Sequence, residues 1–252
     1  MKRNLSHALL LTMLLTPAAY ADALGIQAGV NSWSYDISGT LRYKSQDSAN
    51  DIDVNDDLGY DDDSLTHLYA IFDHPLPMIP NIKLSMTNID TSSNGQLSGS
   101  VVYGNTTFNV NENVSSELKL EQIDLTLYYR ILDNVANFDL GLNLKYIDAE
   151  GTITGENSGT ETADISAVVP MLYAGAGIDL PFTGLSVSAD GSVIGYQDST
   201  FYDFTVKANY TTPWLLGVDV GYRALKLDLD DLDDSYSDVE FEGPYAGLYL
   251  QF

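Results

Sequence analysis

The chain contains no cysteine and few basic residues. Its 252 residues include 11 Lys and Arg against 36 Asp and Glu, which gives a formal net charge of −25. The lack of cysteine excludes disulfide bonds, thiolate metal ligands and a cysteine nucleophile. The acidic excess argues against nucleic acid as a partner, because binding phosphates requires clustered Lys and Arg.

Long apolar runs are missing after the first 21 residues. Lys2 and Arg3 precede an apolar stretch over 8–15, and Ala19-Tyr20-Ala21 places small residues where a signal peptidase cleaves. This pattern predicts a signal peptide over 1–21, with an exported mature domain over 22–252. No later run reaches the ~18 apolar residues of a helical span, so the mature chain either is soluble or crosses a membrane with alternating strands.

Recognisable catalytic motifs are also missing. The sequence has no Gly-rich phosphate loop, zinc-ligand pattern or Ser nucleophile elbow. We therefore predict that the protein is not an enzyme and holds no resident cofactor.

The positions of the basic residues are the most informative feature present. Of the nine Lys and Arg after residue 21, eight have an apolar neighbour on both sides, as Arg130 has in Tyr129-Arg130-Ile131. Several aspartates are flanked in the same way, among them Asp36, Asp124, Asp139, Asp179, Asp203 and Asp219. Neighbours in a strand point to opposite faces, so the pattern predicts an all-β chain with charges on one face and apolar residues on the other.

Alternation alone does not say which face points inward, but two features favour lipid outside. The expected connections alternate between short turns and long loops, as in membrane barrels. Aromatic residues gather at both strand ends, which suits two membrane interfaces. Phe72, Tyr129, Phe138, Phe182, Tyr210 and Trp214 lie near the turns, and Tyr43, Tyr146, Tyr202, Tyr222 and Phe241 lie near the loops.

The C-terminal segment supplies the third feature. The chain ends on Phe252, with Leu250, Leu248 and Ala246 in phase on one face. This resembles the last strand of bacterial outer-membrane barrels, and the start of the mature chain (Asp22-Ala23-Leu24-Gly25) is similar to a family of small gammaproteobacterial outer-membrane barrels. The resemblance implies an outer-membrane location, surrounding lipid and lipopolysaccharide, and passage through periplasmic chaperones to the barrel-assembly machinery, which reads Phe252, Leu250 and Leu248.

Alternation and turn residues predict an up-and-down antiparallel barrel of ten strands. We expect the strands at 24–43, 65–74, 81–91, 117–132, 137–150, 163–180, 184–196, 200–211, 214–228 and 238–252. Long loops should cover 44–64, 92–116, 151–162, 197–199 and 229–237. Eight strands remain an alternative because 197–199 separates its neighbours weakly. Twelve would require a further hairpin within 95–110.

The inward face should carry a polar network. The phase of the strands assigns Asp124, Arg130, Asp139, Lys145, Asp190, Asp203, Lys207, Asp219 and Arg223 to the lumen. Charges of both signs in so narrow a barrel should pair and fill it, because an unpaired buried charge is costly. We therefore expect a non-enzymatic structural or binding barrel. The alternative is a narrow pore with a weak preference for cations.

Two loops concentrate negative charge, and both should be extracellular. The last carries Asp228, Asp230, Asp231, Asp233, Asp234 and Asp238, and barrel closure should bring it towards the first. The first offers hard oxygen ligands for Ca²⁺ or Mg²⁺, and Asp51-Ile52-Asp53 begins like an EF-hand loop. Asp56 stands where that motif needs glycine and Asp62 replaces its glutamate. The pattern therefore favours a solvated acidic loop over a metal-binding loop. The candidate ligands are Asp51, Asp53, Asn55, Asp57, Asp61 and Asp62.

His67 is the remaining candidate for a catalytic residue. It should lie at the loop end of its strand, close to Asp61, Asp62 and Asp63. Ten-stranded proteases of the omptin type use a His–Asp pair and an Asp pair at that rim, so a rim protease is a remote alternative. His74, beside Pro75, has only a turn role.

Overall fold

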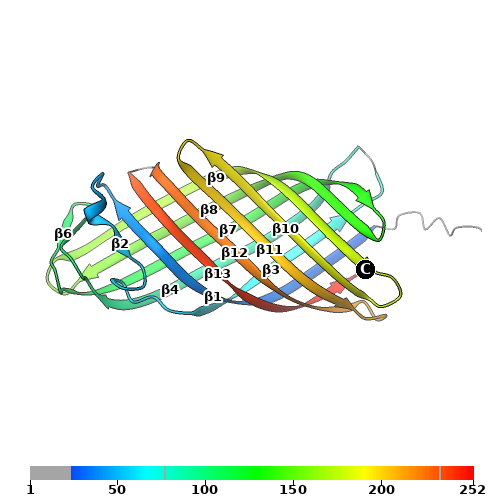
Figure 1. The fold of residues 1–252 in the computed structure, drawn as a ribbon, viewed down its shortest axis with the longest axis horizontal. Helices are drawn as coiled ribbons and strands as arrows, with labels where there is room; N and C mark the ends of the chain where they lie inside the picture. The colour runs from blue at the N-terminus through cyan, green and yellow to red at the C-terminus, as the bar shows by residue number, and fades with distance from the viewer. Residues whose placement is uncertain (1–23, 77, 233) are drawn as a thin grey trace, which may run out of the picture.

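The computed structural model describes residues 24–76, 78–232 and 234–252, which form one elongated, closed antiparallel barrel (Figure 1). The predicted signal peptide lies outside these residues. Ten strands run around the barrel in chain order, and β13 closes it against β1 with a ladder from Gln27–Gln251 to Tyr43–Ser235. They are β1 (Gly25–Tyr43), β3 (Asp63–Asp73), β4 (Asn81–Gln96), β7 (Asn113–Asp133), β8 (Ala136–Gly155), β9 (Gly159–Leu180), β10 (Leu185–Tyr196), β11 (Ser199–Thr211), β12 (Leu216–Leu232) and β13 (Ser235–Gln251).

The predicted all-β barrel of ten strands is confirmed, and the counts of eight and twelve are wrong. The hairpin that twelve strands would require does exist, as β5 (Val101–Tyr103) and β6 (Thr106–Phe108), but it forms a separate two-stranded sheet. The described helix is the three-residue η1 (Ser48–Asn50), and no described helix has the length and apolar character needed to cross a bilayer.

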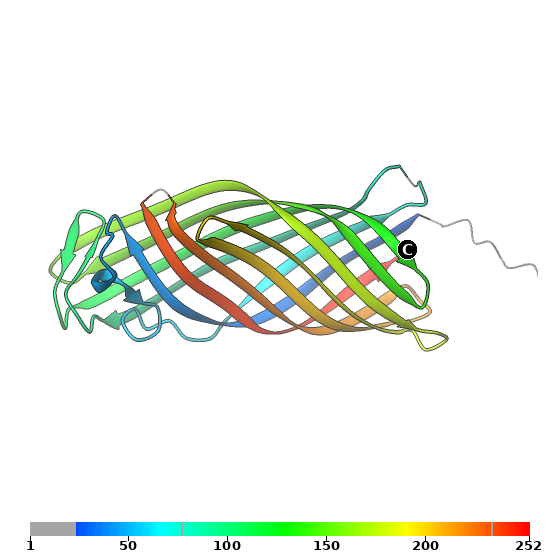
Figure 2. The same cartoon turned by 45° about the horizontal axis from the view of Figure 1, so that its top comes forward.

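The two ends of the barrel differ. The turn end carries the short connections and the C-terminus, and the loop end carries η1, β2 (Ile52–Asp53) and the β5–β6 hairpin (Figures 1 and 2). Several strands continue further towards the loop end than expected. β8 runs to Gly155 and β9 begins at Gly159, so most of the loop expected over 151–162 is strand. Much of the loop expected over 229–237 is likewise the end of the β12–β13 hairpin.

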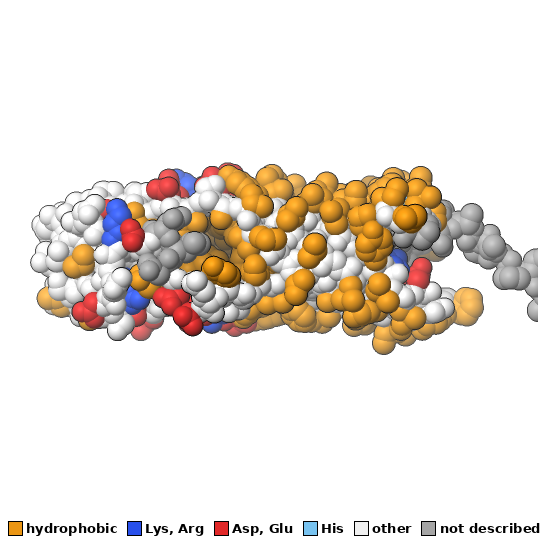
Figure 3. Space-filling model, turned by 90° about the horizontal axis from the view of Figure 1, so that it is seen from above, with side chains coloured by type: hydrophobic (Ala, Val, Ile, Leu, Met, Phe, Trp, Pro, Cys, Tyr) orange, Lys and Arg blue, Asp and Glu red, His pale blue; other side chains and the backbone are white. Residues whose placement is uncertain are grey.

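The apolar face of the strands changes sides along the barrel. On β8 the outward-facing residues near the turn end are apolar and exposed, from Phe138 to Tyr146, whereas Ile147 and Ile153 are buried inside and Asp148 is exposed. The adjacent apolar pair Tyr146-Ile147 marks the change of phase. Figure 3 shows the result on one face: apolar side chains cover the turn end, and charged and polar side chains cover the loop end. Exposed apolar side chains occur on strands all around the barrel, among them Val30, Leu84, Leu142, Val187 and Val220, and form an apolar band.

This inversion corrects one expectation. Charged residues flanked by apolar neighbours do not all share the inward face, because Asp36, Lys119 and Lys226 lie at the loop end and point outward. There the apolar neighbours fill an internal core, so the charges face solvent. The residues flanked in this way around the apolar band, such as Lys145 and Arg223, point inward as expected.

The barrel wall is lower at the β10–β11 hairpin than elsewhere. The β9–β10 ladder stops at Leu172–Val193, although β9 continues to Gly159. The hairpin turns at Gln197 and Asp198, while the neighbouring β8–β9 pair extends to Gly155–Gly159. Among the described residues, the loop end of β9 therefore has a strand partner on its β8 side alone.

Candidate functional site within the barrel

The interior has three layers, and the first is a polar vestibule at the turn end. It encloses about 350 Å³. Arg130 lies between Asp139, whose oxygen is 3.1 Å from Nε, and Asp73, whose oxygen is 3.4 Å from NH2. Deeper in the vestibule, Lys83 pairs with Asp190. The cations and carboxylates of the vestibule come from five strands, β3, β4, β7, β8 and β10.

A layer of buried ions crosses the middle of the barrel. Lys145 lies 2.6 Å from Asp124 and 2.9 Å from Asp203, and Arg223 donates to Asp203 through Nε (2.9 Å) and NH2 (2.7 Å). The Lys145 side chain is 1% exposed. Gln122 donates to both Asp124 and Asp203. One carboxylate, Asp203, thus serves two cations and an amide, which is the kind of satisfied network a buried charge requires.

Aromatic rings cover this ionic layer. The Arg223 guanidinium lies 4.7 Å from the centre of the Trp33 ring, and Lys145 Nζ lies 5.5 Å from the Phe201 ring. Trp33 Nε1 donates to the carbonyl of Gly243, so the indole is held against the neighbouring strand β13. Cation–π contacts of this kind strengthen where water is excluded.

Two of the expected lumen residues, Lys207 and Asp219, do not form the expected ion pairs with the described residues. Lys207 points inward, but no carboxylate oxygen of the described residues lies within salt-bridge distance of its Nζ, which lies 5.8 Å from the Tyr69 ring. Asp219 accepts from the Tyr69 hydroxyl at 3.3 Å. The structure therefore places all nine expected lumen residues inside and joins six of them in direct ion pairs with one another: Asp124, Arg130, Asp139, Lys145, Asp203 and Arg223.

His67 does not lie at the rim as expected. Its Nδ1 lies 2.9 Å from the Thr87 hydroxyl and 3.3 Å from Arg223 NH1, within the ionic layer. Four residues of β3, from Asp63 to Thr66, lie between His67 and the loop end of the strand, and the inward phase of His67 places its ring in the lumen. His74 lies in the turn, where its Nδ1 accepts from the Leu76 amide.

The third layer is an apolar chamber at the loop end, which was not predicted from the sequence. The first loop folds into the barrel mouth, where Ile52, Val54 and Leu58 are buried. The β5–β6 hairpin adds Val101 and Phe108 to the same core. The signal was available in the alternation of Asp51-Ile52-Asp53-Val54, but the many aspartates favoured a solvated loop.

The acidic loop residues serve the fold of the loop. Asp57 accepts from the backbone of Asp53 and Ser98, Asn55 donates to the carbonyls of Ile37 and Tyr60, and Asp51 pairs with Arg42. The Asp53 carboxylate accepts from the backbone amides of Asn55 and Asp56, and Asp61 accepts from the amide of Asp62. No group of three His, Cys, Asp or Glu among the described residues is arranged to hold a metal ion. The two loops do meet, since the Lys44 amide donates to the Asp234 carbonyl.

The C-terminal residues complete the barrel at the turn end. Phe252 exchanges backbone hydrogen bonds with Ile26, and Leu248, Leu250 and Phe252 project outward from β13. The predicted terminal strand is thus built into the closing seam.

The chain resembles known proteins in its fold. No protein-family model matches the chain, and neither does any curated protein sequence. Among solved structures, the outer membrane protease OmpT from Escherichia coli matches with a TM-score of 0.60 at 12% identity, covering 92% of this chain and 98% of that one. The chain has the fold of an outer-membrane β-barrel.

Two further structures match over most of their length but superpose less well. The translocator domain of the autotransporter NalP from Neisseria meningitidis has a TM-score of 0.47 at 10% identity, covering 98% of this chain and 96% of that one. Ail from Yersinia pestis has a TM-score of 0.40 at 9% identity, covering 90% and 99%. At such identities the comparisons show the fold and leave activity open.

Proposed function

We propose that the protein is an integral outer-membrane barrel, inserted after export, with a closed lumen and a non-enzymatic structural or binding role. The apolar band around the turn end supports the membrane location, because exposed aliphatic side chains of this extent are stable against acyl chains and not against water. Outer-membrane lipid and lipopolysaccharide surround that band, and the exposed end of β13 suits recognition by the assembly machinery.

The observation that carries the closed lumen is the ionic layer. Lys145, Gln122 and Thr87 come from three different strands and are fully buried. They pack across the interior together with Arg223, and the apolar chamber lies beyond them. A conducting path would have to separate these ion pairs and displace that core. The alternative, a narrow pore with a weak cation preference, would need both.

Conductance in planar bilayers tests this proposal. Purified protein should insert, as its heat-modifiable migration on gels would report, and give no steady channel events at any voltage. A variant in which Lys145 and Arg223 are both replaced by Ala serves as the comparison, because it removes the cations that close the middle layer. Steady, cation-selective openings of the wild type would overturn the closed lumen and establish the pore.

The location of His67 supports a non-enzymatic role. A histidine general base needs a free nitrogen within reach of a substrate proton. Here Nδ1 faces Thr87 and Arg223 inside the barrel, and no carboxylate hydrogen-bonds to the ring among the described contacts. The likeness to OmpT therefore extends to the barrel, and among the described residues His67 forms no hydrogen bond with an aspartate. Incubation with denatured casein should release no peptides.

A further inference from the structure

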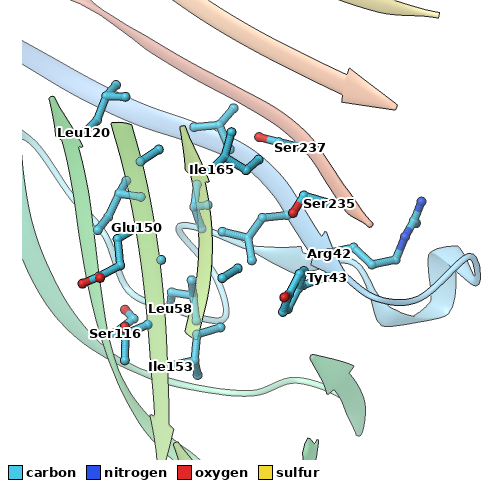
Figure 4. Close-up of a pocket in the computed structure, with 18 of the residues that line it drawn as sticks. Arg42, Tyr43, Leu58, Ser116, Leu120, Glu150, Ile153, Ile165, Ser235 and Ser237 are labelled. Atoms are coloured by element: carbon cyan, nitrogen blue, oxygen red, sulfur yellow. The ribbon is translucent and has the colours of Figure 1, made fainter. Parts of the chain in front are cut away.

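The apolar chamber at the loop end contains a cavity of about 120 Å³ (Figure 4). Its walls are mostly aliphatic and aromatic, with Leu58, Leu120, Ile153 and Phe241 among them. An engineered apolar cavity of about 150 Å³ in another protein stays dry and binds benzene. The volume here is thus of the size that accommodates a single ring or a short alkyl group.

The cavity lies beside the low part of the barrel wall. Ala163 and Ile165, on the part of β9 beyond the β9–β10 ladder, line one side of it. Leu227 and Leu229, at the loop end of β12, line another. Beyond the tip of the β10–β11 hairpin, no strand of the described residues pairs with both β9 and β12 to close the gap between them, and side chains of both strands line the cavity on this side.

This gap begins where the apolar band ends. Val193 and Tyr196 near the hairpin tip are exposed and apolar, as is Val168 on β9. A molecule dissolved in the outer leaflet would meet these side chains first and then the lining of the cavity. Figure 3 shows apolar side chains continuing from the turn end towards a recess near the loop end.

Three polar groups in the lining make no hydrogen bond to the described residues: the hydroxyls of Ser116 and Ser235 and Nε of Arg42. The Ser235 hydroxyl is buried and makes no hydrogen bond to the described residues, and Figure 4 shows it directed towards the other lining side chains. A buried hydroxyl without a partner is costly, and a ligand with a hydrogen-bonding group would remove that cost. The charges at the rim are already paired, since Lys119 lies 2.9 Å from Glu117 and 3.3 Å from Glu150 and Arg42 pairs with Asp51. The site therefore favours an uncharged ligand.

We propose that this cavity binds a small uncharged hydrophobic molecule that carries one hydrogen-bonding group, and that the molecule enters from the outer leaflet through the gap above β10–β11. The route rests on the proposed membrane location, whereas the binding site rests on the cavity alone. The ring or alkyl part occupies the aliphatic pocket, and the polar group meets Ser235.

Fluorine NMR of protein in lipid nanodiscs tests the site with 4-fluorobenzyl alcohol and 4-fluorotoluene as probes. Wild-type protein should give a bound resonance that saturates with each probe. Filling the cavity with Ala149→Leu and Ala163→Leu, singly and together, should abolish it. Ala208→Leu, a matched change on the lipid-facing side of β11, should leave it unchanged. Empty nanodiscs correct for partition into lipid.

The hydroxyl has its own readout. Ser235→Ala should weaken the binding of 4-fluorobenzyl alcohol by roughly two- to tenfold, the range of one hydrogen bond, and leave the binding of 4-fluorotoluene unchanged. Circular dichroism and heat-modifiable migration establish that each variant folds. If the double variant does not fold, either single variant that fills the cavity is sufficient for the test. Equal signals from wild type and a folded, filled variant would overturn the proposal. Channel conductance of the wild type would overturn the closed lumen and leave this result untouched, so the two failures are distinguishable.

Discussion

At the scale of single residues, Asp203 is the carboxylate on which the middle layer depends. It accepts from Lys145 and from two nitrogens of Arg223, and all three side chains are at most 13% exposed. Asp203→Ala should destabilise the barrel by about 3–5 kcal/mol, because it leaves two buried cations short of a partner. Urea unfolding in lipid vesicles measures this. Lys119→Ala, which breaks pairs that are more than 40% exposed, should cost less than about 1 kcal/mol. Equal effects of the two changes would contradict the assigned role of the layer.

Glu112 gives a prediction with a defined pH window. Its carboxylate accepts from the Ser158 hydroxyl and from the amides of Asn109, Asn157 and Ser158, and these bonds lower its pKa from 4.5 to about 2. A lowered pKa means that the bonds stabilise the folded loop fully above pH 4.5 and lose this effect as the pH falls towards 2. Hydrogen exchange at the amides of Asn157 and Ser158, corrected for intrinsic rates, should therefore accelerate across that interval. In Glu112→Gln the protection should be lower and independent of pH there.

At the scale of elements, strand number and phase around the apolar band could be predicted from the sequence, because lipid imposes strict alternation on β7, β8 and β12. The ends of the strands could not. Thr152 and Thr154 read as loop residues, yet they form cross-strand hydroxyl pairs with Thr162 and Thr160. Such pairs stabilise a strand only once its partner is in register, and that register is not visible in local composition.

The first loop shows another limit of local reading. Its burial depends on a change of neighbour, because β3 stops pairing with β1 at Tyr35–Asp63 and β2 takes its place at Thr40 and Leu41. Gly39 permits the change. Its φ is +113°, and its carbonyl accepts from the Val54 amide. The apolar phase of 52–58 could be seen in the sequence, whereas the space that receives it could not.

Gly39→Ala tests this arrangement. A Cβ at Gly39 would clash with the Asp238 carbonyl on β13, and the positive φ adds strain for any side chain. We expect a loss of about 1–3 kcal/mol in unfolding free energy and faster hydrogen exchange at the Val54 amide. Gly99→Ala is the matched control, since a Cβ there meets no neighbouring atom. A Gly39→Ala protein with wild-type stability and protection would show that β2 docks without this backbone conformation.

At the scale of the whole molecule, the inversion of apolar faces separates a membrane barrel from a water-exposed barrel within the same strands. Near the turn end the strands present apolar residues outward and ions inward, and at the loop end the order is reversed. β8 carries both arrangements, with Leu142 54% exposed on its outer face and Thr154 exposed on the same face nearer the loops. The candidate ion network could be anticipated from the sequence because it belongs to the first regime. The apolar chamber could not be anticipated, because alternation along a strand does not show where its apolar face changes from the outside to the inside of the barrel.

The boundary between the two regimes can be located with single cysteines, since the native chain has none to interfere. Leu142→Cys and Thr154→Cys lie on the same outward face of β8, and each is labelled with an environment-sensitive fluorophore before refolding into vesicles. The label at 142 should emit to the blue and be quenched by lipids that carry nitroxides on their acyl chains, because it contacts hydrocarbon. The label at 154 should emit as in water and respond to aqueous iodide. If both labels behaved as in water, the apolar band would not contact lipid. If both behaved as in hydrocarbon, the loop end would lie within the membrane, and the gap beside the β10–β11 hairpin would open into the bilayer interior instead of at its surface.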